Sequence, residues 1–336
     1  MQDNPDMLQK GKKLLFLRFS SLGDVVIANF TAMEIKKKHP EYELTWFVNT
    51  PYDEIVHAQP WVDDIIVWDK KRTGTRGYIN ILRYIRRRHF DIIVDMHATD
   101  RTCLLCVLAG VPVRYGVHKE YPFAHTSFDM SEIMDTSVKI SNCKKYLCAP
   151  RYDSENLPKI PAGARTVGLA IGASFAVKRW PVKRWIEFCD IAEHEGYYML
   201  LLGSGVDECA AAHEIESAVP DEKVINLAGK LSLGELVAVV GMSDVVVSGD
   251  TGIMHIARAL GVPVAGLFGP NFPMLGEDYE NSLGKKFLCK CPNVGCQKHE
   301  CTRQCLEDIA ASDVLEGVRE LMGARKASKL AAGKHR

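Results

Sequence analysis

The chain has 336 residues, 47% of them hydrophobic and 25% charged, which is typical of a soluble globular protein with about two domains. Its 42 basic and 42 acidic residues cancel, so no overall field favours a nucleic acid partner. No apolar run approaches the roughly 20 residues of a membrane span, the polar start predicts no signal peptide, and eleven cysteines favour a reducing cytoplasm.

The first half of the chain alternates short apolar runs with amphipathic stretches. We expect strands at 13–19, 44–48, 65–68, 91–95 and 113–116, and helices at 25–38, 52–58, 78–88 and 101–109. Strands that alternate with helices are typical of a parallel sheet that is covered by helices. Residues 117–163 lack strong periodicity, and 156–163 contains two prolines and a glycine, which indicates a linker.

A second alternating set follows this linker. We expect strands at 166–171, 197–202, 224–227, 245–247 and 264–268, and helices at 182–195, 207–218, 233–241, 251–260 and 311–323. The sequence therefore predicts two α/β domains, 1–157 and 158–336, each doubly wound, with a cleft between them.

The stretch around Asp250 is the most informative one. A β-branched run at 245–247 leads into Ser248-Gly249-Asp250-Thr251-Gly252 and then into a helix that Gly261 and Pro263 terminate. The first amides of such a helix carry a partial positive charge at the carboxyl end of a parallel strand, where phosphate groups bind. An ordinary capped helix would look the same, but His255 lies one turn beyond Thr251 on the same face and favours a site.

Two further loops follow the second domain's first two strands. The first, Gly172-Ala173-Ser174 to Lys178, combines small residues with a hydroxyl and a cation suited to phosphate, although a solvated surface loop is an equal alternative. The second, Gly203-Ser-Gly205-Val-Asp207-Glu208, lacks the third glycine of the dinucleotide fingerprint. An acidic residue there, Asp207 or Glu208, could instead hold a ribose diol.

The turn after the first strand reads Ser20-Ser21-Leu22-Gly23-Asp24. We expect Gly23 to allow a tight turn and Asp24 to lie near the start of the following helix, at the carboxyl edge of the sheet. A carboxylate in that place can simply cap the helix, and the residues alone favour that role. A phosphate-binding glycine loop is poorly supported, because the turn has one glycine.

The segment 289–305 contains five cysteines and His299 within 17 residues. Its spacing matches no standard zinc ribbon or finger, which favours reduced or labile disulfide-forming cysteines on a surface loop and leaves a zinc site as the alternative. Basic clusters at 36–38 and 86–88 lie at expected helix ends, where cations suit the helix dipole. They could also attract an anionic acceptor or an anionic membrane surface.

Taken together, the motifs around Asp24, Ser174 to Pro181, and Ser248 to His255, with the later Phe268-Gly-Pro270, resemble the heptosyltransferases of glycosyltransferase family 9. The resemblance covers residues 13 to about 322. It implies the GT-B fold, in which two Rossmann-like domains face each other across a cleft and bind acceptor and donor respectively. It also implies inverting, metal-independent transfer of heptose from ADP-heptose to the lipopolysaccharide inner core, on the cytoplasmic side of the inner membrane.

By position, Asp24 matches the family's catalytic base, and Ser20, Ser21 and Gly23 fall on the acceptor side. Residues on the donor side are expected to be Ser174 and Lys178 at the diphosphate, Asp207 or Glu208 at the ribose, Leu231 over the adenine, and Asp250, Thr251, Gly252 and His255 around the sugar and phosphates. No cofactor is implied. The dense cysteine segment departs from the best-known members and leaves the acceptor open.

Other classes of function remain as alternatives at this stage. A GT-B nucleotide-sugar epimerase would share the donor site, and a nucleotide-sugar-binding protein without glycan transfer would tolerate loss of Asp24. An NAD-dependent dehydrogenase would need a full glycine fingerprint, which neither domain shows.

Overall fold

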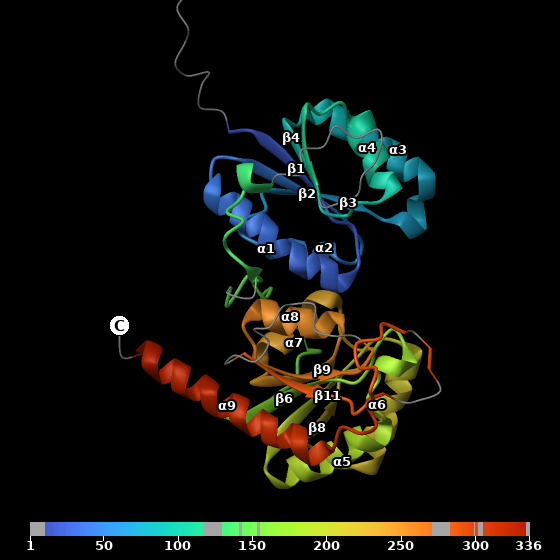
Figure 1. The fold of residues 1–336 in the computed structure, drawn as a ribbon, viewed down its shortest axis with the longest axis vertical. Coiled ribbons are helices and arrows are strands. Elements are labelled where there is room, and N and C mark those ends of the chain that lie inside the picture. Colours follow the sequence, from blue (N-terminus) through green and yellow to red (C-terminus); the bar gives the residue numbers. More distant parts are fainter. Residues whose placement is uncertain are drawn as a thin grey trace, which may run out of the picture. The chain divides into compact units, whose positions relative to one another are not determined.

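The chain divides into two compact units in a computed structural model that describes residues 11–116, 130–140, 143–152, 155–270, 283–298, 300–301 and 305–333. The first unit comprises Met1–Lys139 with Tyr146–Cys148, and the second comprises Ile140–Lys145 with Ala149–Arg336 (Figure 1). Each unit contains one parallel sheet, as the alternating pattern predicted.

The first unit has a five-stranded sheet in the order β3-β2-β1-β4-β5. Its strands are β1 (Lys13–Leu17), β2 (Glu43–Asn49), β3 (Asp64–Trp68), β4 (Ile92–Asp95) and β5 (Val113–Gly116). Its helices are α1 (Leu22–Lys38), α2 (Asp53–Val56), α3 (Lys70–Arg88) and α4 (Asp100–Ala109). Four residues of β1, Leu14 to Leu17, are fully buried, and each such side chain stabilises the fold by about 1.5–3 kcal/mol.

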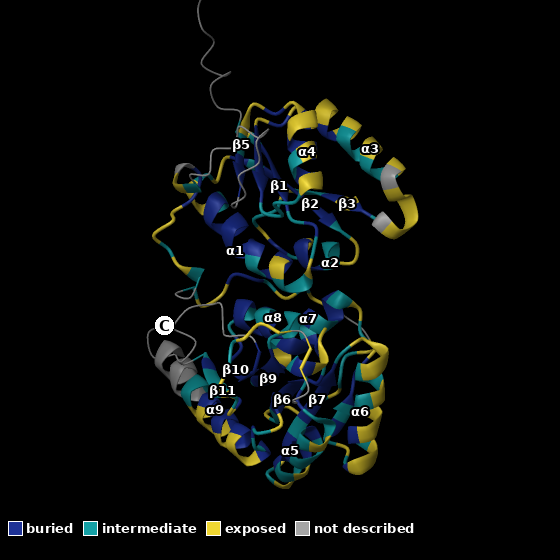
Figure 2. Ribbon diagram, turned by 45° about the vertical axis from the view of Figure 1, so that its right-hand side comes forward, coloured by how far each residue is buried: buried dark blue, intermediate teal, exposed yellow. Residues whose placement is uncertain are grey.

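The second unit has a six-stranded sheet in the order β11-β10-β9-β6-β7-β8. Its strands are β6 (Arg165–Ala170), β7 (Tyr197–Leu202), β8 (Val224–Asn226), β9 (Val245–Gly249), β10 (Val264–Phe268) and β11 (Gly284–Leu288). Its helices are α5 (Val182–His194), α6 (Val206–Ala218), α7 (Leu233–Met242), α8 (Gly252–Leu260) and α9 (Ala311–Gly333). In both units the strands are mostly buried, whereas α3, α4, α5, α6 and α9 expose one side (Figure 2).

Several elements differ from the sequence-based expectation. Helix α1 begins at Leu22 rather than at residue 25, so Gly23 lies inside the helix and forms no turn of its own. Helix α3 extends back to Lys70 across a kink at Gly74, whose φ of 51° suits glycine. Strand β11 was not predicted, and α9 continues to Gly333 rather than ending at 323.

The order of the strands creates one topological switch point in each sheet. In the first unit the chain proceeds from β1 to β2 and β3, and it then crosses over to β4 and β5, so the loops after β1 and β4 diverge. In the second unit the loops after β6 and β9 diverge in the same way. Open parallel sheets bind ligands at such points, outside the carboxyl ends of the strands.

Candidate functional site

The switch point of the second unit is bridged by an ion pair. The loop after β6 forms a short 3-10 turn, Ala176–Lys178, and the loop after β9 begins with Asp250. Lys178 Nζ lies 3.0 Å from Asp250 Oδ2, and the two side chains are 15% and 26% exposed. Residues 72 positions apart thus meet where the fold favours a ligand, as expected if both belong to one site.

The start of helix α8 adjoins this pair. Thr251 is the N-cap residue, and its hydroxyl lies 3.0 Å from Ser248 Oγ instead of capping the helix. Gly252 opens the helix, and a Cβ on Gly249 would lie 2.9 Å from the Lys178 carbonyl oxygen. His255 Nε2 lies 3.8 Å from Asp250 Oδ1. The Lys178 ammonium and the His255 imidazole therefore flank one carboxylate, directly before the first turn of α8.

Glu208 occupies a second position at the same edge of the sheet. As the third residue of α6, it accepts hydrogen bonds at Oε2 from the N–H groups of Ser204 (2.6 Å) and Gly205 (3.0 Å). A Cβ on Gly172 would lie 2.0 Å from Glu208 Oε1, so only glycine leaves room for this carboxylate. A Cβ on Gly203 would lie 2.9 Å from Glu208 Cβ, so the glycines at 172 and 203 both leave room for this acid.

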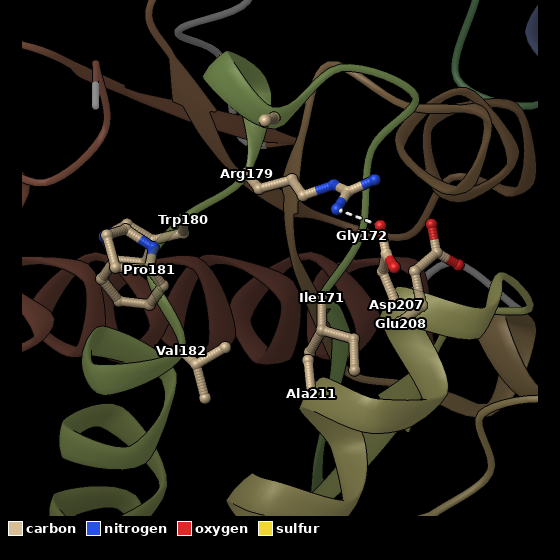
Figure 3. A pocket seen from close by; sticks show the side chains of 10 residues that line it. Ile171, Gly172, Arg179, Trp180, Pro181, Val182, Asp207, Glu208 and Ala211 are labelled. Atoms are coloured by element: carbon tan, nitrogen blue, oxygen red, sulfur yellow. Dashed lines mark hydrogen bonds and ion pairs between the residues drawn. The ribbon is translucent and has the colours of Figure 1, made fainter. Parts of the chain in front are cut away.

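A pocket of about 240 Å³ lies beside Glu208. Figure 3 shows the Arg179 side chain pointing toward Asp207, with Trp180 and Pro181 on the other side of the view. Arg179 Nη1 is 2.9 Å from Asp207 Oδ2, and Asp207 is 73% exposed. Of the two acidic candidates, Glu208 is held by the backbone, whereas Asp207 is a surface carboxylate engaged with Arg179.

The two remaining donor-side candidates, Ser174 and Leu231, lie at the same edge. Ser174 is exposed in the loop after β6, and Leu231 is half-buried between β8 and α7. Within the described residues, neither forms a hydrogen bond with Lys178, Asp250 or Glu208. Their assignment to the donor side depends only on their position in loops at this edge of the sheet.

Asp24 lies at the switch point of the first unit. It is the third residue of α1 and accepts hydrogen bonds at Oδ2 from the Ser21 N–H (3.2 Å) and the Ser21 hydroxyl (2.9 Å). The Arg18 guanidinium forms an ion pair with the same oxygen, and the Asp24 side chain remains 48% exposed. Burial tends to raise the pKa of Asp24, but the Arg18 charge and the bonds from Ser21 outweigh it and lower the pKa.

Arg18 also connects Asp24 to the loop after β4. Its Nη1 donates a hydrogen bond to the Met96 carbonyl oxygen at 2.5 Å. His97 packs against Phe19 with ring centroids 4.9 Å apart. Burial and the Arg18 charge lower the pKa of His97. Arg18 was not predicted, although a basic residue between a strand and the turn of Asp24 is a signal that could have suggested it.

The cysteine segment is anchored next to β10. Gly295 donates its N–H to the Gly269 carbonyl oxygen at 2.9 Å, and a Cβ on Gly269 would lie 2.8 Å from Cys305 Cβ and 3.9 Å from Cys289 Sγ. All described cysteines are free thiols, and within the described residues no group of three or more potential ligands could hold a metal ion. His299 and residues 302–304 lie outside that part of the chain.

Comparison with known proteins identifies the chain's relatives. The profile of glycosyltransferase family 9 (heptosyltransferase) matches residues 139–307. Lipopolysaccharide heptosyltransferase 2 of Escherichia coli (strain K12) is 36% identical, over 92% of this chain and 98% of that protein. The chain belongs to glycosyltransferase family 9. It is therefore a heptosyltransferase-type glycosyltransferase, and a nucleotide-sugar epimerase or a non-transferring binding protein is not favoured.

Solved structures confirm the GT-B fold that the resemblance implied for this family 9 member. A family 9 glycosyltransferase from Veillonella parvula has a TM-score of 0.75 at 20% identity, covering 93% of this chain and 97% of that one. The ADP-heptose LPS heptosyltransferase II of E. coli has a TM-score of 0.70 at 20% identity, covering 94% and 99%. None of the helices that the structure describes combines the length and apolarity needed to cross a membrane.

Proposed function

We propose that this family 9 glycosyltransferase moves heptose from ADP-heptose to the inner core of lipopolysaccharide, with Kdo-lipid A or a heptosylated core as the acceptor. The observation that carries the proposal is the Lys178–Asp250 pair at the switch point of the second sheet. The names of its relatives, lipopolysaccharide heptosyltransferase 2 and ADP-heptose LPS heptosyltransferase II, support the same donor and acceptor.

The donor diphosphate is assigned to Lys178 and the start of α8. A lysine ammonium has three N–H donors, and the contact with Asp250 uses one of them. Thr251 and Gly252 present the first amides of the helix, where the macrodipole favours an anion. When the bond between the anomeric carbon and the phosphate oxygen breaks, these groups stabilise the charge that develops on ADP without a metal.

The sugar and the nucleoside are assigned to the neighbouring polar groups. Asp250 is a poor neighbour for a phosphate, because both are anionic, but its carboxylate suits the hydroxyl groups of heptose, as does His255. Glu208 suits the two hydroxyls of the adenosine ribose, and Ser174 and Leu231 are assigned to the diphosphate and the adenine. Between the two acids of α6, the seating of Glu208 on backbone amides favours it over Asp207.

Asp24 is assigned the role of general base, with Ser20, Ser21 and Gly23 beside the acceptor. Its lowered pKa keeps the carboxylate ionised at neutral pH, so it can accept the proton of the acceptor hydroxyl. The ion pair with Arg18 makes it a weaker base but fixes its position. We place the reaction in the cytoplasm, at the inner face of the inner membrane, where the acceptor is a lipid.

The proposal is tested by mass spectrometry of the nucleotide and glycan products, with ADP-heptose and Kdo-containing acceptors as substrates. The expected result is one ADP for each heptosylated acceptor. Donor binding without any product across the panel of acceptors would refute the transfer. Calorimetry with ADP separates the two acids, because Glu208→Gln should weaken ADP binding more than Asp207→Asn does.

A further inference from the structure

Helix α3 is strongly basic. Its 19 residues include no acidic residue, and its cations are Lys70, Lys71, Arg72, Arg76, Arg83, Arg86, Arg87 and Arg88. Two of these are neutralised locally, because Arg72 pairs with Asp69 and Arg88 pairs with Glu43 and Asp64. Arg76, Arg83 and Arg87 are exposed, and within the described residues none of the three forms an ion pair with a carboxylate.

Helix α4 lies beside α3 on the same face of the first sheet. The Tyr78 hydroxyl of α3 donates to the Arg101 carbonyl oxygen at 2.5 Å, and Arg86 Nε donates to the Leu108 carbonyl oxygen at 2.7 Å. Ile85 of α3 and Leu105 of α4 belong to one buried core with the strands. Their opposite sides therefore face away from the sheet together, as the exposed colouring of both helices shows (Figure 2).

The outward side of these two helices is also unusually apolar. On α4, Leu104, Val107 and Leu108 are 54%, 39% and 38% exposed, at a spacing that places them on one helical face. On α3, Ile79 and Tyr84 are 43% and 42% exposed. Large aliphatic side chains that gather on an exposed face next to cations mark an interaction surface.

The other basic cluster of the sequence, residues 36–38 in α1, has engaged side chains and, among the described residues of its helix, no exposed large apolar neighbours. Lys36 pairs with Asp63, Lys37 pairs with Glu34, and Lys38 donates to the Ser131 carbonyl oxygen. These lysines serve contacts within the unit, and no exposed large hydrophobic residue of the described chain belongs to α1. In the 86–88 cluster Arg86 and Arg88 also make contacts within the unit, but Arg87 forms no ion pair within the described residues and lies on a helix with exposed apolar side chains.

We propose that the α3–α4 face, comprising Ile79, Arg83, Tyr84, Arg87, Leu104, Val107 and Leu108 with Arg76, docks on an anionic phospholipid bilayer. Aliphatic and aromatic side chains next to unpaired arginines suit the boundary between acyl chains and anionic headgroups. An acidic protein would pair with the arginines but would not require the aliphatic row. The inference deepens the proposed function, because it gives the enzyme a surface that binds the membrane in which its lipid acceptor lies. It is argued from the exposed residues of α3 and α4 and does not depend on heptosyl transfer.

Vesicle co-sedimentation of the full chain tests the proposal, with phosphatidylcholine vesicles that contain or lack phosphatidylglycerol. We expect binding only to the anionic vesicles, weakened by salt. Arg83→Gln with Arg87→Gln should reduce binding roughly 30-fold, because each cation near such a surface contributes about a factor of five. The matched control, Lys159→Gln with Lys183→Gln, removes two exposed charges from the second unit and should bind like the wild type.

A second pair of variants tests the exposed apolar side chains of the α3–α4 face. Leu104→Gln should weaken binding to anionic vesicles, whereas Met242→Gln, at a residue 45% exposed on α7, should not. Equal binding by the patch variants and their controls, or no binding of the wild type to anionic vesicles, would overturn the proposal. Heptosyl transfer to a lipid-free Kdo oligosaccharide should be unchanged in the patch variants, and its absence in the wild type would count against the proposed function only.

Discussion

Replacing Asp24 with Asn separates catalysis from helix capping. The asparagine side-chain oxygen can still accept the two hydrogen bonds from Ser21, so what is lost is the ion pair with Arg18 and the ability to take a proton. Asp24 is 48% exposed, and ion pairs at such sites are worth up to about 1 kcal/mol, so the melting temperature should fall by no more than about 2–4 °C. A positioned general base contributes about 10²–10⁴-fold to the rate, so transfer should fall at least about 100-fold, equivalent to about 2.7 kcal/mol.

The assay is single-turnover formation of heptosylated acceptor with ADP-heptose bound to saturation, together with thermal unfolding. Asp69→Ala is the matched control, because the Asp69 carboxylate caps α3 in the same unit by accepting a hydrogen bond from the Arg72 N–H. It should lose about 1 kcal/mol of stability and transfer heptose normally. Asp24→Asn with a near wild-type rate would show that Asp24 only caps α1, and the base would then be sought at Asp95, His97 or Asp100.

Three further outcomes are expected. Lys178→Ala should weaken ADP-heptose binding about 10- to 100-fold by calorimetry while Lys183→Ala, in the first turn of α5, does not, and equal affinities would remove Lys178 from the site. Burial and the Arg18 charge lower the pKa of His97 in the folded state, so the unfolded chain takes up a proton at a higher pH than the folded chain does. The free energy of unfolding should therefore decrease as the pH falls from about 7 to 5. His97→Gln should flatten that slope in urea titrations. Transfer should survive a chelator, and a stoichiometric metal at Cys289 and Cys305 whose removal abolishes activity would contradict this.

Periodicity predicted the elements whose buried faces are regular. Strands β7 and β10 begin and end at the predicted residues, because both are short apolar runs bounded by glycine or proline. Strand β11 was not predicted, because Gly284-Lys-Lys-Phe-Leu288 lies at the edge of the sheet and remains partly exposed. Its sequence therefore lacks the apolar run of a buried strand. The first turns of α3 were not predicted to be helical, because they are polar and are joined to the rest of the helix through the kink at Gly74.

In the candidate site, too, short motifs predicted individual residues, whereas contacts between segments distant in the sequence could not be predicted. Motif position alone indicated Lys178 and Asp250, but their contact depends on the crossover that places β9 beside β6. The choice between Asp207 and Glu208 required the helix start, where one-residue shifts decide which acid turns back to the backbone amides. Arg18 was overlooked because its partners, Asp24 and the Met96 carbonyl, come from two separate loops.

The anomeric configuration of the transferred heptose tests the central claim most directly. If Asp24 deprotonates the acceptor hydroxyl for one direct displacement of ADP, the new glycosidic bond must have the configuration opposite to that of the donor. Nuclear magnetic resonance of the purified product, formed from ADP-heptose and a Kdo-containing acceptor, should show that inversion with one ADP released per bond. Retention of configuration, or consumption of donor without a glycosidic product, would contradict it.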